Sequence, residues 1–208
     1  MKRKSVLILF LCLMLFLSGC KKGKPTGSHT DSTSTSNAAA SSTASEQKYY
    51  APYTGEEVSK DVAQKPAFLA IIENYVAARP QSGFTSADIV FEAMTEGGIT
   101  RCLALFQKDD CDKIGPIRSM RTYFLDIAYE YNLPFAHCGG SHDALDRIKN
   151  EPSLMSMNQF ANGSSYWRDP AIKIQEHSLY SSADKLRSLA QSKGYSHEPS
   201  SSLKFVSR

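Results

Sequence analysis

A segment of 27 residues without any large apolar side chain decides where this chain can fold. From Lys21 to Gln47 there is no Val, Ile, Leu, Met or aromatic residue, and 12 of these residues are Ser or Thr. Such a segment cannot bury enough apolar surface to offset the conformational entropy lost on folding. We therefore expect residues 20–47 to form a disordered tether rich in Ser, Thr and Ala, and folding to be confined to residues 48–208.

The residues before this tether have the form of an export signal. Three basic residues precede an apolar run over residues 6–17, and Leu17-Ser18-Gly19-Cys20 follows. A positive start, a short apolar run and small residues before a cleavage point are typical of signal peptides. A helix needs about 20 residues to span a bilayer, so this apolar run is too short for a membrane-spanning helix. The last four residues match the bacterial lipobox.

We therefore predict a lipoprotein signal peptide over residues 1–19 and lipidation of Cys20. The lipid would anchor the protein to the bacterial cell membrane at its extracytoplasmic face. The alternative is an ordinary secretory signal followed by a chance cysteine.

The charges of the chain argue against nucleic acid as a partner. The chain has 24 Lys and Arg residues against 21 Asp and Glu residues, a net charge of +3. Lys2, Arg3 and Lys4 leave with the predicted signal peptide, so the mature chain is neutral. Duplex-binding domains usually carry a basic excess. Any affinity for anions must come from a local group of basic side chains.

Strand and helix patterns alternate through the folding part. Residues 65–72 are a short apolar run after a proline, which indicates a buried strand. Residues 89–95 and 99–107 flank Gly97 and Gly98 and predict a β-hairpin. We expect a further strand at 133–138 and helices at 117–131, at 142–149, and from Ser181 or Ser182 to Gly194. The alternation predicts an α/β fold, a mixed β-sheet with flanking helices.

Four arginines flank the predicted sheet: Arg79, Arg101, Arg118 and Arg121. Arg118 and Arg121 are three residues apart at the start of the helix predicted over 117–131, so we expect them to project from one face of that helix near its positive end. Two guanidinium groups near free backbone N–H groups suit a phosphate or a carboxylate. The alternative is a pair of surface charges answered by Asp126 or Glu130.

Arg101 and Glu92 are charged residues on otherwise apolar strand faces. Arg101 shares a face with Leu103, and Glu92 shares a face with Val90. A turn that brings both onto one face would pair them diagonally. Ligand binding and a structural ion pair at the edge of the sheet are equally open interpretations.

A second motif is the run His137-Cys138-Gly139-Gly140-Ser141-His142. A strand that ends in two glycines and opens a helix can hold an anion in a nest of backbone N–H groups. The motif by itself favours the alternative, a plain tight turn between strand and helix, since no Walker or G-x-G-x-x-G spacing is present.

A third motif places Arg168 and Asp169 shortly before His177. Asp169 is predicted to orient the His177 ring and leave its other nitrogen as a general base. The alternative is a hydrogen-bonded pair that anchors a loop.

The cysteines and histidines give no metal motif. Once Cys12 leaves and Cys20 is lipidated, Cys102, Cys111 and Cys138 remain, so at least one thiol is free. No C-x-x-C, H-x-x-x-H or H-E-x-x-H spacing occurs. We predict neither a metal nor a cofactor.

Several long stretches resemble one bacterial family. They are Glu73-Asn74, Ala78–Gly83, Ala87–Ala93, Glu96–Arg101, Ile114–Ser119, His137–Ser141, Trp167–Asp169 and His177–Tyr180. These stretches are similar to the YerB-like bacterial lipoproteins, which carry domain of unknown function 3048. The resemblance implies that residues 48–208 are the N-terminal α/β domain of that family and that the protein is an exported lipoprotein, but it implies no reaction.

The chain departs from the family pattern in four respects. Ser178 stands where an Asn is usual, Met120 where a small residue is usual, and Cys138 where Ala is usual. Family members also continue into a C-terminal domain, whereas this chain stops at Arg208. We therefore expect a truncated form in which a site between the two domains would be incomplete.

Three functions remain open from the sequence. The first is an envelope lipoprotein that binds an anionic ligand, phosphate or carboxylate, through a pocket built from Arg79, Glu92, Arg101, Arg118, Arg121, His137, Gly139, Gly140, Ser141 and Arg168. The second is an envelope hydrolase or transferase that uses Asp169 and His177. The third is an adaptor whose exposed Tyr49, Tyr50, Tyr53 or Trp167 binds a protein partner of unknown identity.

Overall fold

The computed structural model describes residues 47–195 and residue 199. The predicted signal peptide, the lipidation site Cys20 and all of the predicted tether except residue 47 lie outside the described residues.

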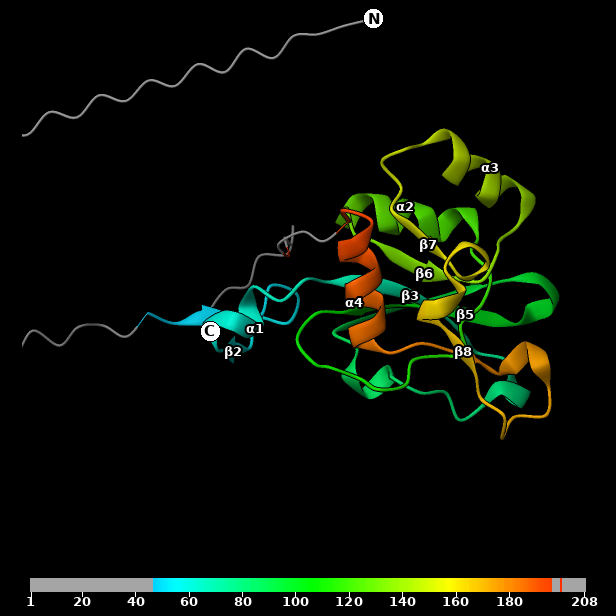
Figure 1. Cartoon of the computed structure of the whole chain (residues 1–208), viewed down its shortest axis with the longest axis horizontal. Helices are drawn as coiled ribbons and strands as arrows, with labels where there is room; N and C mark the ends of the chain where they lie inside the picture. The colour runs from blue at the N-terminus through cyan, green and yellow to red at the C-terminus, as the bar shows by residue number, and fades with distance from the viewer. Residues whose placement is uncertain (1–46, 196–198, 200–208) are drawn as a thin grey trace, which may run out of the picture. The chain divides into compact units, whose positions relative to one another are not determined.

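A five-stranded mixed sheet forms the centre of the folded part (Figure 1). Its strand order is β4-β5-β3-β6-β7, in which β4, β5 and β3 pair antiparallel and β3, β6 and β7 pair parallel. The strands are β3 (Phe68–Glu73), β4 (Ile89–Met94), β5 (Thr100–Phe106), β6 (Phe135–His137) and β7 (Ser156–Asn158).

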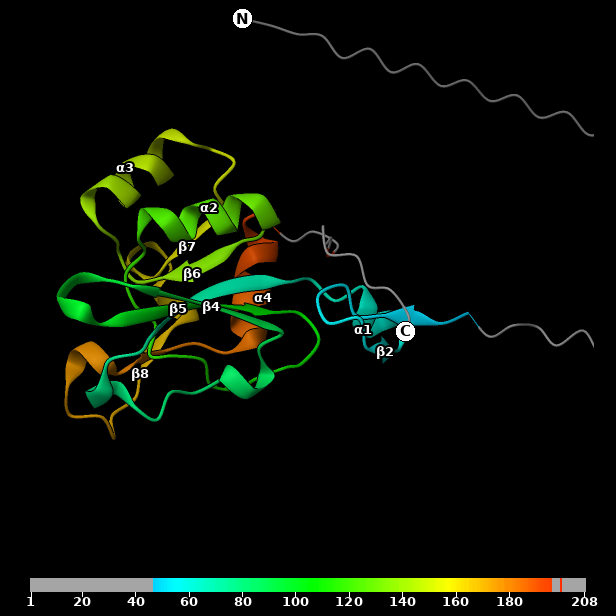
Figure 2. The same cartoon turned by 180° about the vertical axis from the view of Figure 1, so that it is seen from behind.

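Helices cover both faces of this sheet (Figures 1 and 2). On one face, Phe68 and Ile72 of β3 pack with Leu186 of α4 (Ala183–Ser192). On the other, Leu69 and Ile71 pack with residues of α2 (Thr122–Tyr131) and α3 (His142–Asn150). Every residue of β3 is buried, as the apolar run predicts. The predicted α/β class, a mixed sheet with flanking helices, is confirmed.

The ends of the hairpin and of two helices follow local sequence signals. Gly97 and Gly98 take positive φ angles of 69° and 71° between β4 and β5, where a side chain would be strained. Ser141 caps α3, and Ser182, one of the two predicted candidates, caps α4. Gly194 follows the end of α4 with a φ of 71°. The predicted hairpin turn, the cap at Ser182 and the end of the last helix at Gly194 are confirmed.

The shorter elements connect and border the sheet. Two small antiparallel sheets pair β1 with β2 and β8 with β9. The remaining elements are β1 (Tyr49–Tyr50), β2 (Glu57–Val58), α1 (Lys60–Ala63), η1 (Val76–Ala78), η2 (Phe84–Ser86), η3 (Glu96–Gly98), η4 (Gln159–Ala161), η5 (Gly163–Ser165), β8 (Trp167–Arg168), η6 (Gln175–His177) and β9 (Leu179–Tyr180).

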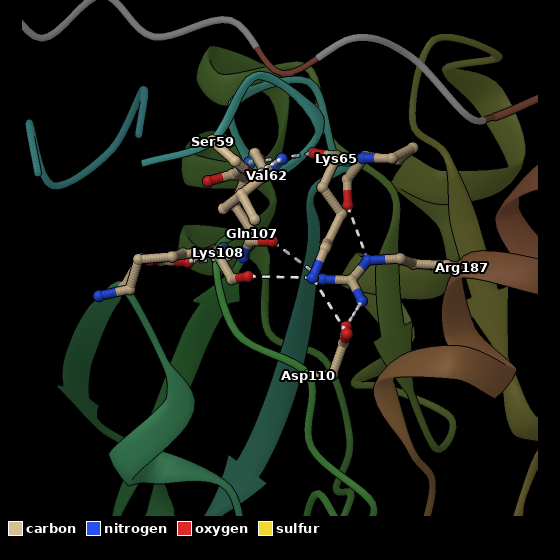
Figure 3. Close-up of polar contacts among 9 residues, drawn as sticks. Ser59, Val62, Lys65, Gln107, Lys108, Asp110 and Arg187 are labelled. Carbon is tan, nitrogen blue, oxygen red and sulfur yellow. Dashed lines mark hydrogen bonds and ion pairs between the residues drawn. The ribbon is translucent and has the colours of Figure 1, made fainter. Parts of the chain in front are cut away.

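A polar network ties three distant segments together at the start of β3 (Figure 3). Arg187 of α4 donates from Nε to the Pro66 carbonyl at 2.9 Å and from a terminal nitrogen to the Gln107 carbonyl at 3.0 Å. Its other terminal nitrogen pairs with Asp110, which also accepts from Lys65 Nζ at 3.0 Å. The network joins α4, the residues before β3 and the loop after β5.

The helices in residues 47–195 are all too short or too polar to cross a membrane.

Candidate functional site

A cavity of about 230 Å³ opens near the carboxyl ends of β3 and β6. Ligand sites in α/β folds commonly lie at the carboxyl ends of parallel strands. Three segments build the cavity: residues 117–119, the end of β6, and the loop from β8 to β9. Its lining residues are Ile117, Arg118, Ser119, Cys138, Arg168, Gln175, Glu176 and Leu179.

Residues 117–120 are extended, and the helix predicted from residue 117 begins only at Thr122. Ile117 bridges Ile72 on one side, and Met120 bridges Gly140 on the other. The Arg118 amide donates to the Ile71 carbonyl at 3.0 Å. Because these backbone groups bond to the sheet and to the turn after β6, they are not available for helical hydrogen bonds. The prediction that Arg118 and Arg121 share one helix face is therefore wrong.

A buried carboxylate links Arg118 to His177. Glu73 ends β3 and is 4% exposed. One of its oxygens lies 2.8 Å from Nδ1 of His177, and the other lies 3.3 Å from Nε of Arg118. Two basic side chains thus converge on one carboxylate beside the cavity.

The predicted pairing of Asp169 with His177 is wrong. Asp169 forms an ion pair with Lys113 and accepts a hydrogen bond from the Ala171 amide at 2.9 Å. Glu73 takes its place because the short turn η6 carries His177 back against the end of β3. The two residues are 104 positions apart, so local spacing could not show the contact.

The contact with Glu73 sets the tautomer of a neutral His177. An ionised carboxylate can only accept, so Nδ1–H donates and Nε2 carries no proton. Among the described residues, Nε2 of His177 has no hydrogen-bond partner. The Tyr75 ring lies 5.8 Å from the imidazole, centroid to centroid. A ring oriented by a carboxylate with one free nitrogen has the arrangement of a general base.

Arg168 forms the wall of the cavity with the loop that follows it. It donates to the Gln175 carbonyl and, at 3.3 Å, to the Ser178 hydroxyl. A terminal nitrogen of Arg118 lies 3.8 Å from the Glu176 carboxylate. Burial raises the pKa of the Cys138 thiol, and the charges of Arg168 and Arg118 oppose that rise. Both guanidinium groups therefore act electrostatically on the same part of the cavity.

Arg101 and Arg121 are not among the residues that line the cavity. Arg101 is 9% exposed and donates to the Ser119 carbonyl at 2.9 Å. Burial lowers its pKa, and the nearby charges of Arg121 and Arg118 lower it further. Arg121 is neutralised by Glu96, with contacts of 2.7 and 2.9 Å. Arg101 supports the cavity through the backbone of Ser119.

The predicted diagonal pair of Glu92 and Arg101 is wrong. In the hairpin Ala93 is opposite Arg101, and Glu92 is opposite Cys102. This register puts the two charges on opposite faces of the sheet. Glu92 and Arg79 instead meet at Asn74, whose amide donates to Glu92 at 2.8 Å and whose side-chain oxygen accepts from Arg79 at 3.1 Å. This network is separate from the residues that line the cavity.

The Gly139–Gly140 turn shapes the site, but its backbone donors are largely taken. The Gly139 amide donates to Asn158 Oδ1 at 3.0 Å, and the Ser141 amide donates to the Met120 carbonyl at 3.1 Å. The Ser141 hydroxyl caps α3. His137 is fully buried, with its ring nitrogens bonded to the protein. The turn holds Cys138 in the wall of the cavity.

Sequence reasoning missed Glu73, Ser119, Gln175 and Glu176. Glu73 left two signals: it is a single acid at the end of an apolar strand, and it lies in a stretch that resembles the family. Ser119 ends another such stretch, whereas Gln175 and Glu176 lie outside those stretches. In the group proposed for an adaptor, Tyr53 is 3% exposed and cannot present its ring to a partner, whereas Tyr50 is 52% exposed.

Among the described residues, the three cysteines outside the N-terminal region are free. No group of three or more His, Cys, Asp or Glu side chains in residues 47–195 is arranged to hold a metal ion.

Comparison with known proteins identifies similar chains. A family model described as "Protein of unknown function (DUF3048) N-terminal domain" matches residues 53–196. The chain is 36% identical over 149 residues to "Putative lipoprotein YerB" of Bacillus subtilis (strain 168), an alignment that covers 72% of this chain and 45% of the relative.

The crystal structure of YerB protein from Bacillus subtilis is similar in fold, with a TM-score of 0.68 and 36% identity. The match covers 74% of this chain and 52% of that one. The chain thus spans about half the length of the relatives that it matches.

Proposed function

The chain belongs to the DUF3048 family, whose function is unknown, and from this premise we propose that it is a membrane-anchored lipoprotein that binds a phosphate or carboxylate group between Arg118 and Arg168. The observation that carries the proposal is the pair of guanidinium groups that line one cavity of about 230 Å³. Guanidinium groups bind such oxyanions by charge-assisted hydrogen bonds. Since the mature chain has no net charge, this local pair supplies the attraction.

Arg118 is held beside the cavity by the carboxylates of Glu73 and Glu176. Its Nε is buried and faces Glu73 without a well-aligned hydrogen bond, while its terminal nitrogens extend toward the cavity residue Glu176. Glu73 holds the guanidinium in place, and His177 holds Glu73. A side chain held in advance loses less conformational entropy when a ligand binds.

Calorimetric titration with inorganic phosphate and with citrate tests the binding proposal. Arg168→Gln should weaken binding of the better probe at least tenfold, because it removes a charge that faces the cavity. Arg147→Gln is the matched control, since Arg147 lies on α3 and pairs with Asp126 and Glu151. Equal affinity of wild type and Arg168→Gln, or no heat with either probe, would refute the proposal.

The membrane anchor is proposed from Cys20 and from the name of the relative, a putative lipoprotein. Lipidated protein partitions into the detergent phase when a Triton X-114 extract of bacterial cells is warmed. Cys20→Ser should move the protein to the aqueous phase. Detergent partitioning that is the same for both forms would contradict lipidation at Cys20.

A second function, hydrolysis of a bound ester, is favoured by the pairing of Glu73 with His177. Nε2 of His177 would take a proton from water while the water oxygen attacks the phosphorus or carbonyl carbon. The bond to the leaving oxygen would break with its electron pair, and the arginines would stabilise the negative charge. Glu73 replaces Asp169 in this hypothesis because the structure pairs it with the ring.

Release of p-nitrophenol from p-nitrophenyl phosphate and p-nitrophenyl acetate tests this second function. His177→Gln should lower the rate at least a hundredfold, the usual contribution of a general base. Asp169→Asn is the control and should leave the rate unchanged. A wild-type rate equal to that of buffer would rule out the activity on these esters.

A further inference from the structure

Exposed apolar side chains lie next to residues that line the cavity or to their neighbours in the chain. Ile174 is 51% exposed and directly precedes Gln175 and Glu176, which line the cavity. Phe160 is 77% exposed, and a Cβ placed on Gly139, next to Cys138, would lie 3.1 Å from its ring. Single exposed apolar residues are ordinary, but a group of them beside a cavity marks an interaction site.

A third apolar side chain lies on the side of His177. Tyr75 is 40% exposed and packs its ring against the imidazole of His177. In both views the turn η6, in orange, lies beside η1, in blue-green, which directly follows Tyr75 (Figures 1 and 2). The apolar rim is defined here as Tyr75, Phe160 and Ile174.

The size of the cavity explains why the rim matters. Its volume of about 230 Å³ is below the about 300–1,000 Å³ typical of sites that enclose a whole small ligand. A phosphate or carboxylate with a few further atoms fills it. The rest of any larger ligand must lie across the mouth, where it meets the rim.

The chemistry of the rim favours hydrocarbon over a polyol. Ile174 has no polar atom in its side chain and Phe160 has none either, so neither can hydrogen bond to hydroxyl groups. Covering the water-exposed apolar surface of these side chains with a hydrocarbon chain lowers the free energy of the complex. The charged arginines of the cavity and the apolar rim together match a molecule with an anionic end and a hydrocarbon chain.

We propose that the ligand of this site is an amphiphile, a phosphate monoester of a hydrocarbon chain, whose phosphate enters the cavity between Arg118 and Arg168 and whose chain lies on the apolar rim. This inference rests on the proposed function and adds the class of ligand. Charge complementarity selects the phosphate end, and the limited cavity volume places the chain outside.

Calorimetric titration with inorganic phosphate, methyl phosphate, butyl phosphate and hexyl phosphate tests the inference, with each alkyl phosphate kept below its micelle concentration. The dissociation constant should fall about two- to fourfold for each added methylene, the upper figure corresponding to the full burial of a CH₂ group at about 0.8 kcal/mol. Glycerol phosphate, similar in size to butyl phosphate but polar, should bind no more tightly than methyl phosphate.

Variants of the rim separate the chain from the phosphate. Ile174→Ser and Phe160→Ser should flatten the dependence on chain length and leave the affinity for inorganic phosphate unchanged. Tyr129→Ser, at a 57% exposed position on α2, is the control and should behave as wild type.

The possible outcomes distinguish the two proposals. If wild-type protein binds inorganic phosphate but hexyl phosphate binds no more tightly, the ligand class is wrong and the anion site stands. A glycerol phosphate affinity equal to that of hexyl phosphate, or rim variants that keep the full chain-length dependence, would also overturn the ligand class. If citrate binds but no phosphate does, the ligand class is wrong and the anion site stands. If neither citrate nor any phosphate binds, both proposals fail.

Discussion

Acid should destabilise this domain through one buried imidazole, that of His137. The residue ends β6 and is fully buried. Its Nδ1 lies 2.7 Å from the Gly139 carbonyl, and its Nε2 lies 2.7 Å from the Ser156 hydroxyl. Because a carbonyl only accepts, Nδ1–H donates to Gly139 and Nε2 accepts from Ser156. The neutral ring is thus fully satisfied, and a proton would place a charge in the core.

The size of the effect follows from the pKa of His137. Burial lowers this pKa from 6.5 to about 4. The unfolded chain therefore binds a proton between pH 6.5 and about 4 that the folded chain does not bind. The stabilisation is complete above pH 6.5 and is lost as the pH falls to about 4. At about 1.4 kcal/mol per pH unit, the loss is about 3 kcal/mol.

Urea unfolding at pH 7 and at pH 4 measures this loss, and His137→Gln provides the comparison. Wild type should lose about 3 kcal/mol more than His137→Gln between the two pH values. His142→Gln is the matched control, because the side chain of His142 is 87% exposed, and it should follow wild type. An equal loss in wild type and His137→Gln would refute the reasoning.

A second measurement tests the same prediction if His137→Gln does not fold. Titration of the His137 ring protons by NMR in the wild-type protein gives its pKa directly. A value near 6.5 would show that burial does not exclude the charged form, and the argument would fail.

Three further predictions concern the framework of the domain. Gly115→Ala should lower the free energy of unfolding by about 2 kcal/mol or more in urea titrations. The new Cβ would lie 2.8 Å from the Leu179 carbonyl oxygen, and residue 115 has a φ of 144°, which strains any residue with a side chain. Unchanged stability would contradict this steric argument. Arg187→Met keeps an aliphatic side chain but removes the hydrogen bonds to two carbonyls. Thermal unfolding should show that the free energy of unfolding falls by about 2 kcal/mol. A decrease below about 0.5 kcal/mol would show that water replaces these hydrogen bonds. Arg121→Gln should raise the pKa of the Glu96 carboxyl from about 2 toward 4.5 in an NMR titration. The associated stabilisation is present above pH 4.5 and is lost toward pH 2. It should stay below about 1 kcal/mol, because the Glu96 carboxylate is exposed to solvent. A Glu96 pKa that stays near 2 in the variant would refute the pairing.

Much of the fold was predictable because its signals are local. The apolar run before Glu73, the Gly97–Gly98 turn and the serine cap at Ser182 all act within a few residues. The family resemblance came from the same kind of contiguous stretches and is confirmed. The start of α2 was mispredicted because residues 117–120 hydrogen bond to the sheet instead of to their own helix.

The site was only partly predictable because its contacts are not local. Arg118, Arg168 and His177 were recognised as candidates from their residue types. The partner of His177 was not, because Glu73 reaches the ring only through the packing of η6 against the end of β3. The hairpin register likewise separated Glu92 from Arg101, since a shift of one residue moves a side chain to the other face.

The sequence by itself determined the class of the fold, the family and the residue types able to bind an anion, because periodicity, turn residues and motifs are properties of short segments. Only the tertiary structure decided that Arg118 and Arg168 share a cavity, that Glu73 orients His177, and that the Tyr75 ring packs against His177. These contacts join segments that are far apart in the sequence. The hydrophobic packing of the whole domain determines which of these segments meet.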